Sequence, residues 1–188
     1  MIKAIIFDFF DVIRSDPYKA WLHNHGYKRE GEFLKVVDAM DSGKINLQEF
    51  LNSLSTLSGQ SYEEIVAEFE SVSRIDFELV EFIKTLKNKY KTGLLSNAPS
   101  KYIRDIISQN KLEPYFDEIV ISSEVGHTKP SKEIFEIMLN KLNLNPSDVV
   151  FIDDSKMHIE GAQKIGIKSI QYESLSQLKN DLKKLQIQ

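Results

Sequence analysis

The feature that most constrains the fold of this chain is a set of short apolar runs that lack the polar alternation of a half-exposed strand. The two clearest runs are Ile2–Phe9 and Val149–Asp153, which are nearly all apolar and rich in Ile, Val and Phe. Strands buried on both faces have this composition, because helices cover both faces of a parallel sheet. Three more runs are predicted strands, namely Thr92–Ser96, Glu118–Ser122 and Lys168–Tyr172.

Helical patterns fill the intervals around the later runs. They span Phe77–Lys89, Ser100–Asn110, Lys132–Leu142, Met157–Ile165 and Ser174–Leu185. Strands and helices that alternate at these lengths form right-handed β–α–β units. The predicted fold class is therefore α/β, with a doubly wound, mainly parallel, Rossmann-like sheet.

The interval from Ser15 to Ile75 breaks this alternation, because its sequence holds helical patterns and no convincing strand. Ser61 and Glu64 have the spacing of a capping box, which supports a helix start there. We predict a core domain of residues 1–14 and 76–188 and a small all-helical domain of residues 15–75, the helical insertion. Its predicted helices lie near Tyr18–Asn24, Glu30–Met40, Leu47–Leu57 and Tyr62–Val72.

Charge and composition exclude several classes of protein. The chain has 188 residues, with 24 Lys and Arg against 28 Asp and Glu, so its formal charge is 24 − 28 = −4. Non-specific nucleic-acid binding needs a net basic face, and the absence of Cys excludes disulfides, thiolate metal sites and a Cys nucleophile. No run approaches the roughly 20 apolar residues of a membrane helix, and the first residues lack the pattern of a secretory signal. We expect a cytoplasmic protein without a nucleic-acid or membrane partner; the sequence leaves the oligomeric state open.

Polar side chains follow four of the predicted strands near the points where those strands end. Ligand sites of open α/β sheets gather at the carboxyl ends of the strands. Each group alone has an ordinary alternative, since Asp, Ser and Asn cap turns and helices and a lone Lys is usually solvated. Two adjacent carboxylates repel each other, however, and a divalent hard cation relieves that repulsion. In chain order the groups are Asp8, Ser96 with Asn97, Lys129, and Asp153 with Asp154.

This ordered set resembles the haloacid dehalogenase-like (HAD) superfamily, in which an Asp after the first strand attacks phosphorus and forms an aspartyl-phosphate. The resemblance covers nearly the whole chain, because it includes a helical cap inserted after the first strand and Gly161-Ala162 in the helix after the acidic pair. Ordered motifs in the right context rarely coincide by chance. The resemblance implies a hydrolase whose cap closes over the site, excludes water and decides the substrate.

The resemblance implies a role for each polar group on the phosphoryl side. Asp8 is the expected nucleophile, Ser96 and the Asn97 amide are expected to hold phosphoryl oxygens, and Lys129 is expected to offset negative charge. Arg14, just past the first strand, either reaches a second anionic group of the substrate or is an ordinary surface arginine. A cation near the phosphoryl oxygens stabilises the charge that develops there.

The resemblance also implies a Mg²⁺ site. Asp8 and the backbone carbonyl of Phe10 are expected ligands, as is Asp154, while Asp153 binds the ion or supports the site from behind. A metal ion at this place offsets the repulsion between a carboxylate and a phosphate. The implied cofactor is therefore Mg²⁺, and the implied partner is a small phosphorylated metabolite.

Two positions depart from the family pattern. HAD phosphatases typically have a second Asp that protonates the leaving-group oxygen, and this chain has Phe10 in its place. Losing a general acid costs about 10²–10⁴ in rate, most severely for alkyl phosphates with poor leaving groups. Asp11, one residue further on, is a candidate replacement for this acid. Strand geometry would turn it away from Asp8, but the chain leaves the strand at about this point. His158 stands where the family usually has Asn or Asp.

Three functions follow from these residues. The favoured one is a Mg²⁺-dependent phosphatase with restricted substrate scope, because the metal-site carboxylates and Lys129 are present. A metal-independent dehalogenase-like hydrolase is the second, since those enzymes also carry an aromatic residue at the position of Phe10. The third is a phosphate-binding or regulatory domain that has lost turnover.

One pattern in the helical insertion imitates a calcium-binding loop. The segment from Asp38 to Glu49 has Asp first, Gly sixth and Glu twelfth, but its third position is Met40, which offers no side-chain oxygen. We predict a helix–turn–helix there instead.

Overall fold

A five-stranded parallel sheet forms the centre of the computed structural model, which describes residues 1–187. The strands are β1 (Ala4–Phe7), β2 (Lys91–Ser96), β3 (Glu118–Ile121), β4 (Val149–Asp153) and β5 (Lys168–Gln171). They lie in the order β3-β2-β1-β4-β5, and every neighbouring pair is parallel. The predicted α/β class and parallel sheet are confirmed.

The most apolar runs occupy the middle of this sheet, as their composition predicts. Every residue of β1 and β4 is buried, because helices cover both faces of the sheet. In the register of the sheet, Phe7 pairs with Leu94 on one side and Ile152 on the other. The next residues along the two central strands, Asp8 and Asp153, therefore emerge side by side at the carboxyl edge.

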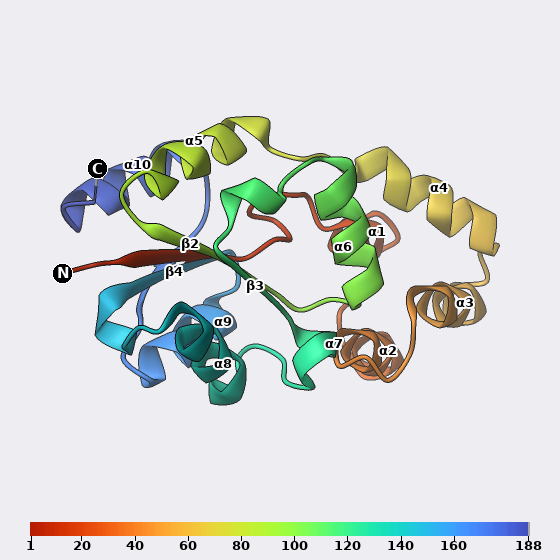
Figure 1. Cartoon of the computed structure of the whole chain (residues 1–188). Coiled ribbons are helices and arrows are strands. Elements are labelled where there is room, and N and C mark those ends of the chain that lie inside the picture. Colours follow the sequence, from red (N-terminus) through yellow and green to blue (C-terminus); the bar gives the residue numbers. More distant parts are fainter. Residues whose placement is uncertain (188) are drawn as a thin grey trace.

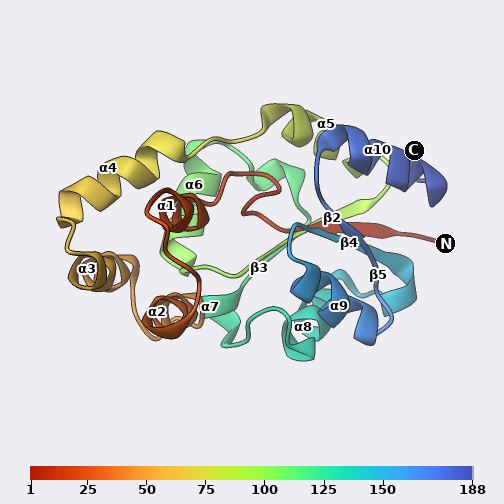
Figure 2. The same ribbon diagram turned by 180° about the vertical axis from the view of Figure 1, so that it is seen from behind.

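Two layers of helices enclose the sheet (Figures 1 and 2). Apolar residues of α5 (Phe77–Lys87), α6 (Ser100–Gln109) and α10 (Leu175–Lys184) share one core cluster with Ile5 and Phe7 of β1. Residues of α8 (Lys132–Leu142) and α9 (Lys156–Lys164) share a second cluster with Ala4 and Ile6. Successive side chains of a strand point to opposite faces, so β1 supplies both cores.

The helical insertion forms α1 (Pro17–Asn24), α2 (Gly31–Asp41), α3 (Leu47–Ser58) and α4 (Tyr62–Val72). Both views place these helices together beyond the carboxyl ends of the strands (Figures 1 and 2). They share a third apolar cluster, which includes the fully buried Trp21, Phe50 and Leu54. The calcium-like segment is the helix–turn–helix formed by the end of α2 and the start of α3.

Capping residues determine where the inserted helices begin. The predicted capping box at Ser61 and Glu64 is present at the start of α4, and a second one, Asn46 with Glu49, begins α3. In each box the N-cap side chain accepts from the backbone N–H of the Glu, and the Glu side chain reaches back to the N-cap amide. This pairing satisfies donors that a helix start otherwise leaves without partners.

The two connections between sheet and insertion run beside each other. The amide of Ser15 donates to the carbonyl of Arg74 at 3.0 Å, and the amide of Arg74 donates to Ser15 Oγ at 2.8 Å. The amide of Asp76 donates to the carbonyl of Ile13 at 2.9 Å. The chain thus leaves and re-enters the sheet layer at almost the same point.

Some elements differ from the prediction. The first strand is shorter than Ile2–Phe9, because the chain turns after Phe7. The unpredicted helix α7 (Ser122–Val125) follows β3 directly, and short 3₁₀ turns η1 (Glu113–Tyr115) and η2 (Pro146–Asp148) precede β3 and β4. Elements of three or four residues are too short to show helical periodicity in a sequence. Within residues 1–187, no helix has the length and apolar character needed to span a membrane.

Candidate active site

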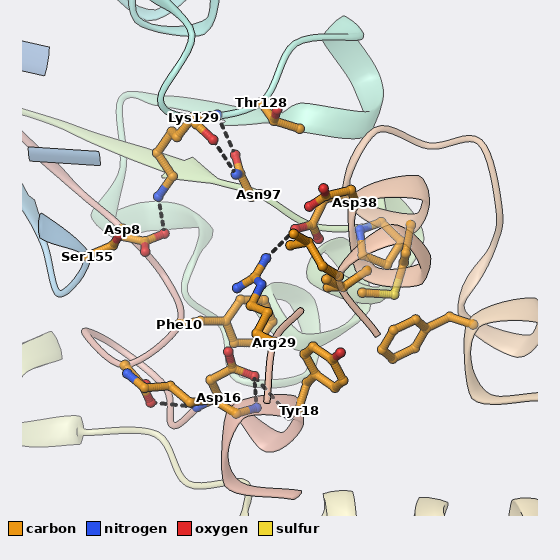
Figure 3. Close-up of a pocket in the computed structure, with 18 of the residues that line it drawn as sticks. Asp8, Phe10, Asp16, Tyr18, Arg29, Asp38, Asn97, Thr128, Lys129 and Ser155 are labelled. Atoms are coloured by element: carbon orange, nitrogen blue, oxygen red, sulfur yellow. Dashed lines mark hydrogen bonds and ion pairs between the residues drawn. The ribbon is translucent and has the colours of Figure 1, made fainter. Parts of the chain in front are cut away.

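A buried ion-pair group lies at the carboxyl edge of the two central strands. Lys129 Nζ is 2.6 Å from Asp8 Oδ1 and 2.7 Å from Asp153 Oδ2 (Figure 3 labels Asp8 and Lys129). The side chain of Lys129 is 1% exposed, that of Asp8 is 7% exposed and that of Asp153 is 0% exposed. The strand register places the two carboxylates together, and the loop before α8 supplies the ammonium. The predicted Asp8, Lys129 and Asp153 therefore meet in one site.

Backbone and side-chain donors fix both carboxylates. The amide of Phe9 donates to Asp8 Oδ1 at 2.7 Å, and the amide of Ser155 donates to Asp153 Oδ1 at 2.8 Å. His158 Nδ1 lies 3.0 Å from both carboxylate oxygens of Asp153. The position at which this chain departs from the family thus holds a residue that orients an acidic side chain of the site.

The sharing of one ammonium by two carboxylates separates their pKa values. Burial opposes ionisation of Asp153, but Lys129 and His158 outweigh it and hold the pKa of Asp153 well below its ordinary value. Burial and the charge of Asp153 together raise the pKa of Asp8, and Lys129 only partly offsets them. Burial also opposes the charge of Lys129, yet the two carboxylates raise its pKa overall. Asp153 is the permanent counter-ion of Lys129, and Asp8 is the carboxylate that a further cation would ionise.

Two neighbours hold the loop that carries Lys129. The Asn97 side chain accepts from the Lys129 amide at 2.8 Å and donates to the Lys129 carbonyl at 3.0 Å (Figure 3). Gly161 of α9 packs directly against Pro130, the residue after Lys129. A Cβ on Gly161 would stand 2.6 Å from Pro130 Cβ and 2.7 Å from the Pro130 carbonyl oxygen. Glycine therefore allows the loop to approach α9 closely enough to direct the ammonium inward.

Ser96 ends β2, beside β1 at the same edge of the sheet. Its hydroxyl is fully buried and has no hydrogen-bond partner among the described residues. A buried hydroxyl without a partner is unfavourable unless a ligand or water satisfies it. Of the predicted pair, Asn97 lines the cavity and its side chain binds the loop of Lys129, whereas Ser96 is not among the described residues that line the cavity.

A second lysine, which the sequence did not identify, faces the outer carboxylates of the site. Lys19 Nζ from α1 is 2.6 Å from Asp11 Oδ2 and 2.9 Å from Asp154 Oδ2. Partial burial opposes its charge, but the bonds to these two carboxylates raise the pKa of Lys19. Asp11 has a φ of 54° and accepts from the Asp16 amide at 2.8 Å, so it faces the helical insertion. A lone Lys in an amphipathic helix gives no sequence signal for this contact.

The charges around the site fit a divalent cation. The four carboxylates of Asp8, Asp11, Asp153 and Asp154 share the two ammonium groups of Lys19 and Lys129, so the formal charge is −2 once Asp8 is ionised. Asp8, Asp153 and His158 offer one ligand atom each, all within 4.8 Å of one another. Carboxylate oxygens are ligands that Mg²⁺ prefers. Asp154, a predicted ligand, lies instead against Lys19.

Arg14 contacts Tyr102 and does not line the cavity over the site. Its guanidinium donates to the Tyr102 hydroxyl at 3.0 Å and lies 5.5 Å from the centre of the Tyr102 ring. Tyr102 and Phe10 line the cavity over the site, whereas Arg14 is not among the described residues that do. Arg14 thus contacts Tyr102 in this structure, and its contact with a second anionic group of the substrate stays a prediction.

The cavity of about 1030 Å³ extends from Asp8 and Lys129 to the helical insertion. Its walls near the sheet include Phe10, Asn97 and Thr128. Its far end is lined by charged and apolar side chains of α1, α2 and neighbouring turns, among them Asp16, Arg29, Asp38, Asp41, Lys44, Val37 and Met40. The volume exceeds that of a phosphate alone and suits a small organic molecule.

Comparisons with known proteins agree with this geometry. A D-ribitol-5-phosphate phosphatase from Bacteroides thetaiotaomicron is 27% identical over an alignment of 204 positions, which covers 97% of this chain and 97% of that protein. A phosphorylated carbohydrates phosphatase from Thermotoga maritima is 29% identical over 162 residues, covering 82% of this chain and 69% of that protein. The crystal structure of a HAD family enzyme from Bacteroides thetaiotaomicron, in complex with magnesium and inorganic phosphate, superposes with a TM-score of 0.73. It has 25% sequence identity and covers 95% of this chain and 99% of that one.

A sequence profile of haloacid dehalogenase-like hydrolases matches residues 37–172, which is more than half of the chain. The match includes most of the helical insertion and strands β2 to β5. Together with the parallel sheet and its acidic carboxyl edge, it confirms the resemblance seen in the sequence. The chain therefore belongs to the haloacid dehalogenase-like hydrolase family.

Proposed function

We propose that this hydrolase is a Mg²⁺-dependent phosphatase that removes the phosphoryl group from a small phosphorylated metabolite. The observation that carries the proposal is the buried Lys129 ammonium between Asp8 and Asp153, at the base of a cavity large enough for an organic substrate. The names of two relatives, phosphatases of D-ribitol 5-phosphate and of phosphorylated carbohydrates, support it. So does the solved relative that contains magnesium and inorganic phosphate.

The proposed reaction has two displacements at phosphorus. A carboxylate oxygen of Asp8 forms a bond to phosphorus while the bond from phosphorus to the leaving-group oxygen breaks, and that oxygen keeps the electron pair. Water then attacks the aspartyl-phosphate and gives up a proton to solvent, the bond from phosphorus to the Asp8 oxygen breaks, and inorganic phosphate leaves, while the leaving-group oxygen takes a proton from solvent. Asp8 returns as a carboxylate, so atoms and charges balance over the cycle.

Three residues are proposed to hold the phosphoryl group during these steps. The Lys129 ammonium offsets charge on the phosphoryl oxygens, and Asp153 fixes its position from the opposite side. The Ser96 hydroxyl, which has no partner among the described residues, gains one when it donates to a phosphoryl oxygen. The Asn97 backbone amide is the proposed second donor, while its side chain holds the Lys129 loop.

Mg²⁺ is proposed to be held by Asp8, the backbone carbonyl of Phe10 and Asp154, with Asp153 supporting the site. When bound, Mg²⁺ supplies positive charge that favours the ionised form of Asp8 and stabilises the equatorial oxygens of the phosphoryl group. The net charge of −2 on the surrounding side chains supports a divalent ion.

The helical insertion is proposed to act as a cap, with residues 15–75 forming the cap domain and residues 1–14 and 76–188 the core. Lys19 of α1 supports this, because its bonds to Asp11 and Asp154 join the first inserted helix to the carboxyl edge of the sheet. The hydroxyl of Ser122 also donates to the carbonyl of Asp41 at the end of α2. Closure of such a cap excludes water from the phosphoryl group.

Phe10 is proposed to restrict the substrates. Its ring stacks on Tyr102 with 6.4 Å between ring centres, and it has no proton to give to a leaving group. The leaving oxygen must then take its proton from solvent, which slows alkyl phosphates more than acyl or aryl phosphates. Restoring an acid at this position by Phe10→Asp should raise the turnover of a sugar phosphate about 10-fold or more.

The test is hydrolysis of acetyl phosphate, an aryl phosphate and a sugar phosphate by the full chain, with Mg²⁺ or with EDTA. We expect Mg²⁺-dependent release of phosphate from the first two, and a loss of at least about 10³-fold in Asp8→Asn. Asp105→Asn, an exposed carboxylate of α6, is the matched control and should keep full activity. A phosphorylated Asp8 peptide, trapped by acid quenching and identified by mass spectrometry, would establish the covalent step.

Other outcomes would redirect the proposal. Release of halide from a haloacid in EDTA, without phosphate release in Mg²⁺, would identify the dehalogenase-like alternative. Binding of phosphate or Mg²⁺ in calorimetry, with no turnover of any phosphate ester by the wild type, would identify a binding domain instead.

A further inference from the structure

Asp41, the last residue of α2, is a buried carboxylate that the proposed reaction does not use. Its side chain is only 8% exposed and lines the cavity at the end formed by the helical insertion. Its nearest charged neighbour is Arg29, whose Nη2 lies 3.5 Å from Asp41 Oδ2, at the outer limit for a hydrogen bond. Asp41 Oδ1 has no hydrogen-bond donor among residues 1–187. A carboxylate so deeply buried normally has closer partners.

The backbone around Asp41 holds it in this position. Its carbonyl accepts from the Ser122 hydroxyl of the core, so the end of α2 is tied to the sheet layer. Gly43 in the following turn lies against Ser123, since a Cβ there would stand 3.0 Å from Ser123 Cβ. The under-bonded carboxylate is therefore presented to the cavity by a packed turn.

Asp41 lines the same cavity as the reacting groups Asp8 and Lys129. Burial raises the pKa of Asp41 to about 7, the Arg29 and Lys129 charges oppose the rise, and Asp16 and Asp38 add to it. Three carboxylates (Asp16, Asp38 and Asp41) face two cations (Arg29 and Lys44) at the far end, an excess of one negative charge.

We infer that Asp41 and Arg29 form a subsite for a hydroxyl group on the leaving-group chain of the substrate, and that this subsite rejects substrates with a second anionic group there. A hydroxyl is both donor and acceptor, so one hydroxyl can donate to Asp41 and accept from Arg29 across the 3.5 Å gap. Above about pH 7, where Asp41 is ionised, a substrate carboxylate or phosphate would meet it as a like charge. A substrate ammonium would meet Arg29 in the same way.

The apolar wall beside this pair suits the carbon side of such a chain. Val37, Met40 and Phe50 are buried, line the cavity and belong to the apolar cluster of the insertion. A polyhydroxylated chain can place its C–H groups on this wall while one hydroxyl meets Asp41. The inference rests on the proposed phosphatase function, since the phosphate must occupy the Lys129 end for the chain to extend this way.

The test uses two phosphate esters that differ at one end of the same six-carbon chain. Glucitol 6-phosphate ends in a hydroxymethyl group, and gluconate 6-phosphate ends in a carboxylate. We expect kcat/KM for glucitol 6-phosphate to exceed that for gluconate 6-phosphate by at least about tenfold. Asp41→Asn should shrink this ratio about tenfold, mainly through KM. Glu32→Gln, which removes one negative charge from an exposed position of the same helix outside the cavity lining, should leave the ratio unchanged.

A binding measurement keeps the subsite testable whatever the turnover. Calorimetry with Asp8→Asn, alone and combined with Asp41→Asn, should show the same preference in Kd and its loss. Equal affinity for the two esters would overturn the inference, and so would an equal change of the ratio in Glu32→Gln. Failure of the proposed function would appear separately, as absent acetyl phosphate turnover in the wild type with the binding preference intact.

Discussion

Two lysines of the site each bind two carboxylates, and their surroundings differ completely. Lys129 joins Asp8 to Asp153 and is 1% exposed, whereas Lys19 joins Asp11 to Asp154 and is 63% exposed. The contact distances are alike, from 2.6 to 2.9 Å, so geometry alone does not distinguish the pairs. Burial decides what each contact does, because charges without water depend wholly on their partners. The inner group is a fixed part of the core, and the outer group is a contact that solvent can replace.

The largest expected effect tests this difference at the inner lysine. Lys129→Met leaves two buried carboxylates without their cation and should lower the free energy of unfolding by about 3–5 kcal/mol. Urea denaturation monitored by circular dichroism measures it. Adding Asp8→Asn to that variant removes one of the stranded charges and should recover part of the loss. No recovery would mean that packing, and not charge, dominates at Lys129.

Asp41 sharpens the comparison as a buried carboxylate that has no lysine partner. Its pKa is raised from 3.8 to about 7, so the folded state holds a proton that the unfolded state releases between these values. The stability that this proton contributes is present at low pH and is lost as pH rises from about 4 to 7, by about 4 kcal/mol at most. Asp41→Asn removes the titration, so its advantage over the wild type should grow from pH 4 to pH 8. Urea denaturation at both pH values checks this, and an advantage that is the same at both would contradict it.

Gly161 tests how precisely the inner lysine must be placed. In Gly161→Ala the new Cβ would stand 2.6 Å from Pro130 and must displace the loop that carries Lys129. We expect a loss of about 1–3 kcal/mol in unfolding free energy, accompanied by a fall in kcat. Gln163→Ala, an exposed change on the same helix, is the control. A fully active Gly161→Ala would show that the loop tolerates a shift.

The smallest expected effect concerns the outer lysine. Lys19→Met makes the same substitution as Lys129→Met but removes an exposed ammonium, so the unfolding free energy should change by less than about 1 kcal/mol. The residual effect should shrink further in high salt, which screens exposed charges. An effect as large as that of Lys129→Met would contradict the distinction between the two groups.

The two carboxylates of the inner group, Asp8 and Asp153, could be predicted from the sequence because the strand register alone brings them together. Asp8 and Asp153 follow the two most apolar runs, and strands with that composition pair at the centre of a parallel sheet. Any side chains at their carboxyl ends must then meet. Lys129 was less certain from its position, and its placement depends on Asn97 and Gly161, whose contacts are tertiary.

The outer contacts could not be predicted, because they depend on how two separately formed parts pack. Lys19 and Asp41 lie on helices whose orientation over the sheet leaves no periodic signal in the sequence. Arg14 contacts Tyr102, which lies 88 residues away, and no local sequence pattern indicates this pairing. The short helix α7, which presents Ser122 to Asp41, was too brief to recognise, and its first residue, Ser122, was assigned to the preceding strand. Long-range side-chain pairing is what the sequence pattern lacks.

The mutual hydrogen bonds of Ser15 and Arg74 have a consequence for how chains of this kind diversify. Because the two connections are hydrogen-bonded to each other, the insertion begins and ends at one point on the sheet. A longer insertion therefore adds little to the entropic cost of bringing its ends together. Residues 16–73 can therefore be lengthened, rebuilt or exchanged as a cassette without disturbing the register of β1 with its neighbours. A different insertion can therefore change which substrates reach the same acidic edge, while the sheet beneath it stays unchanged.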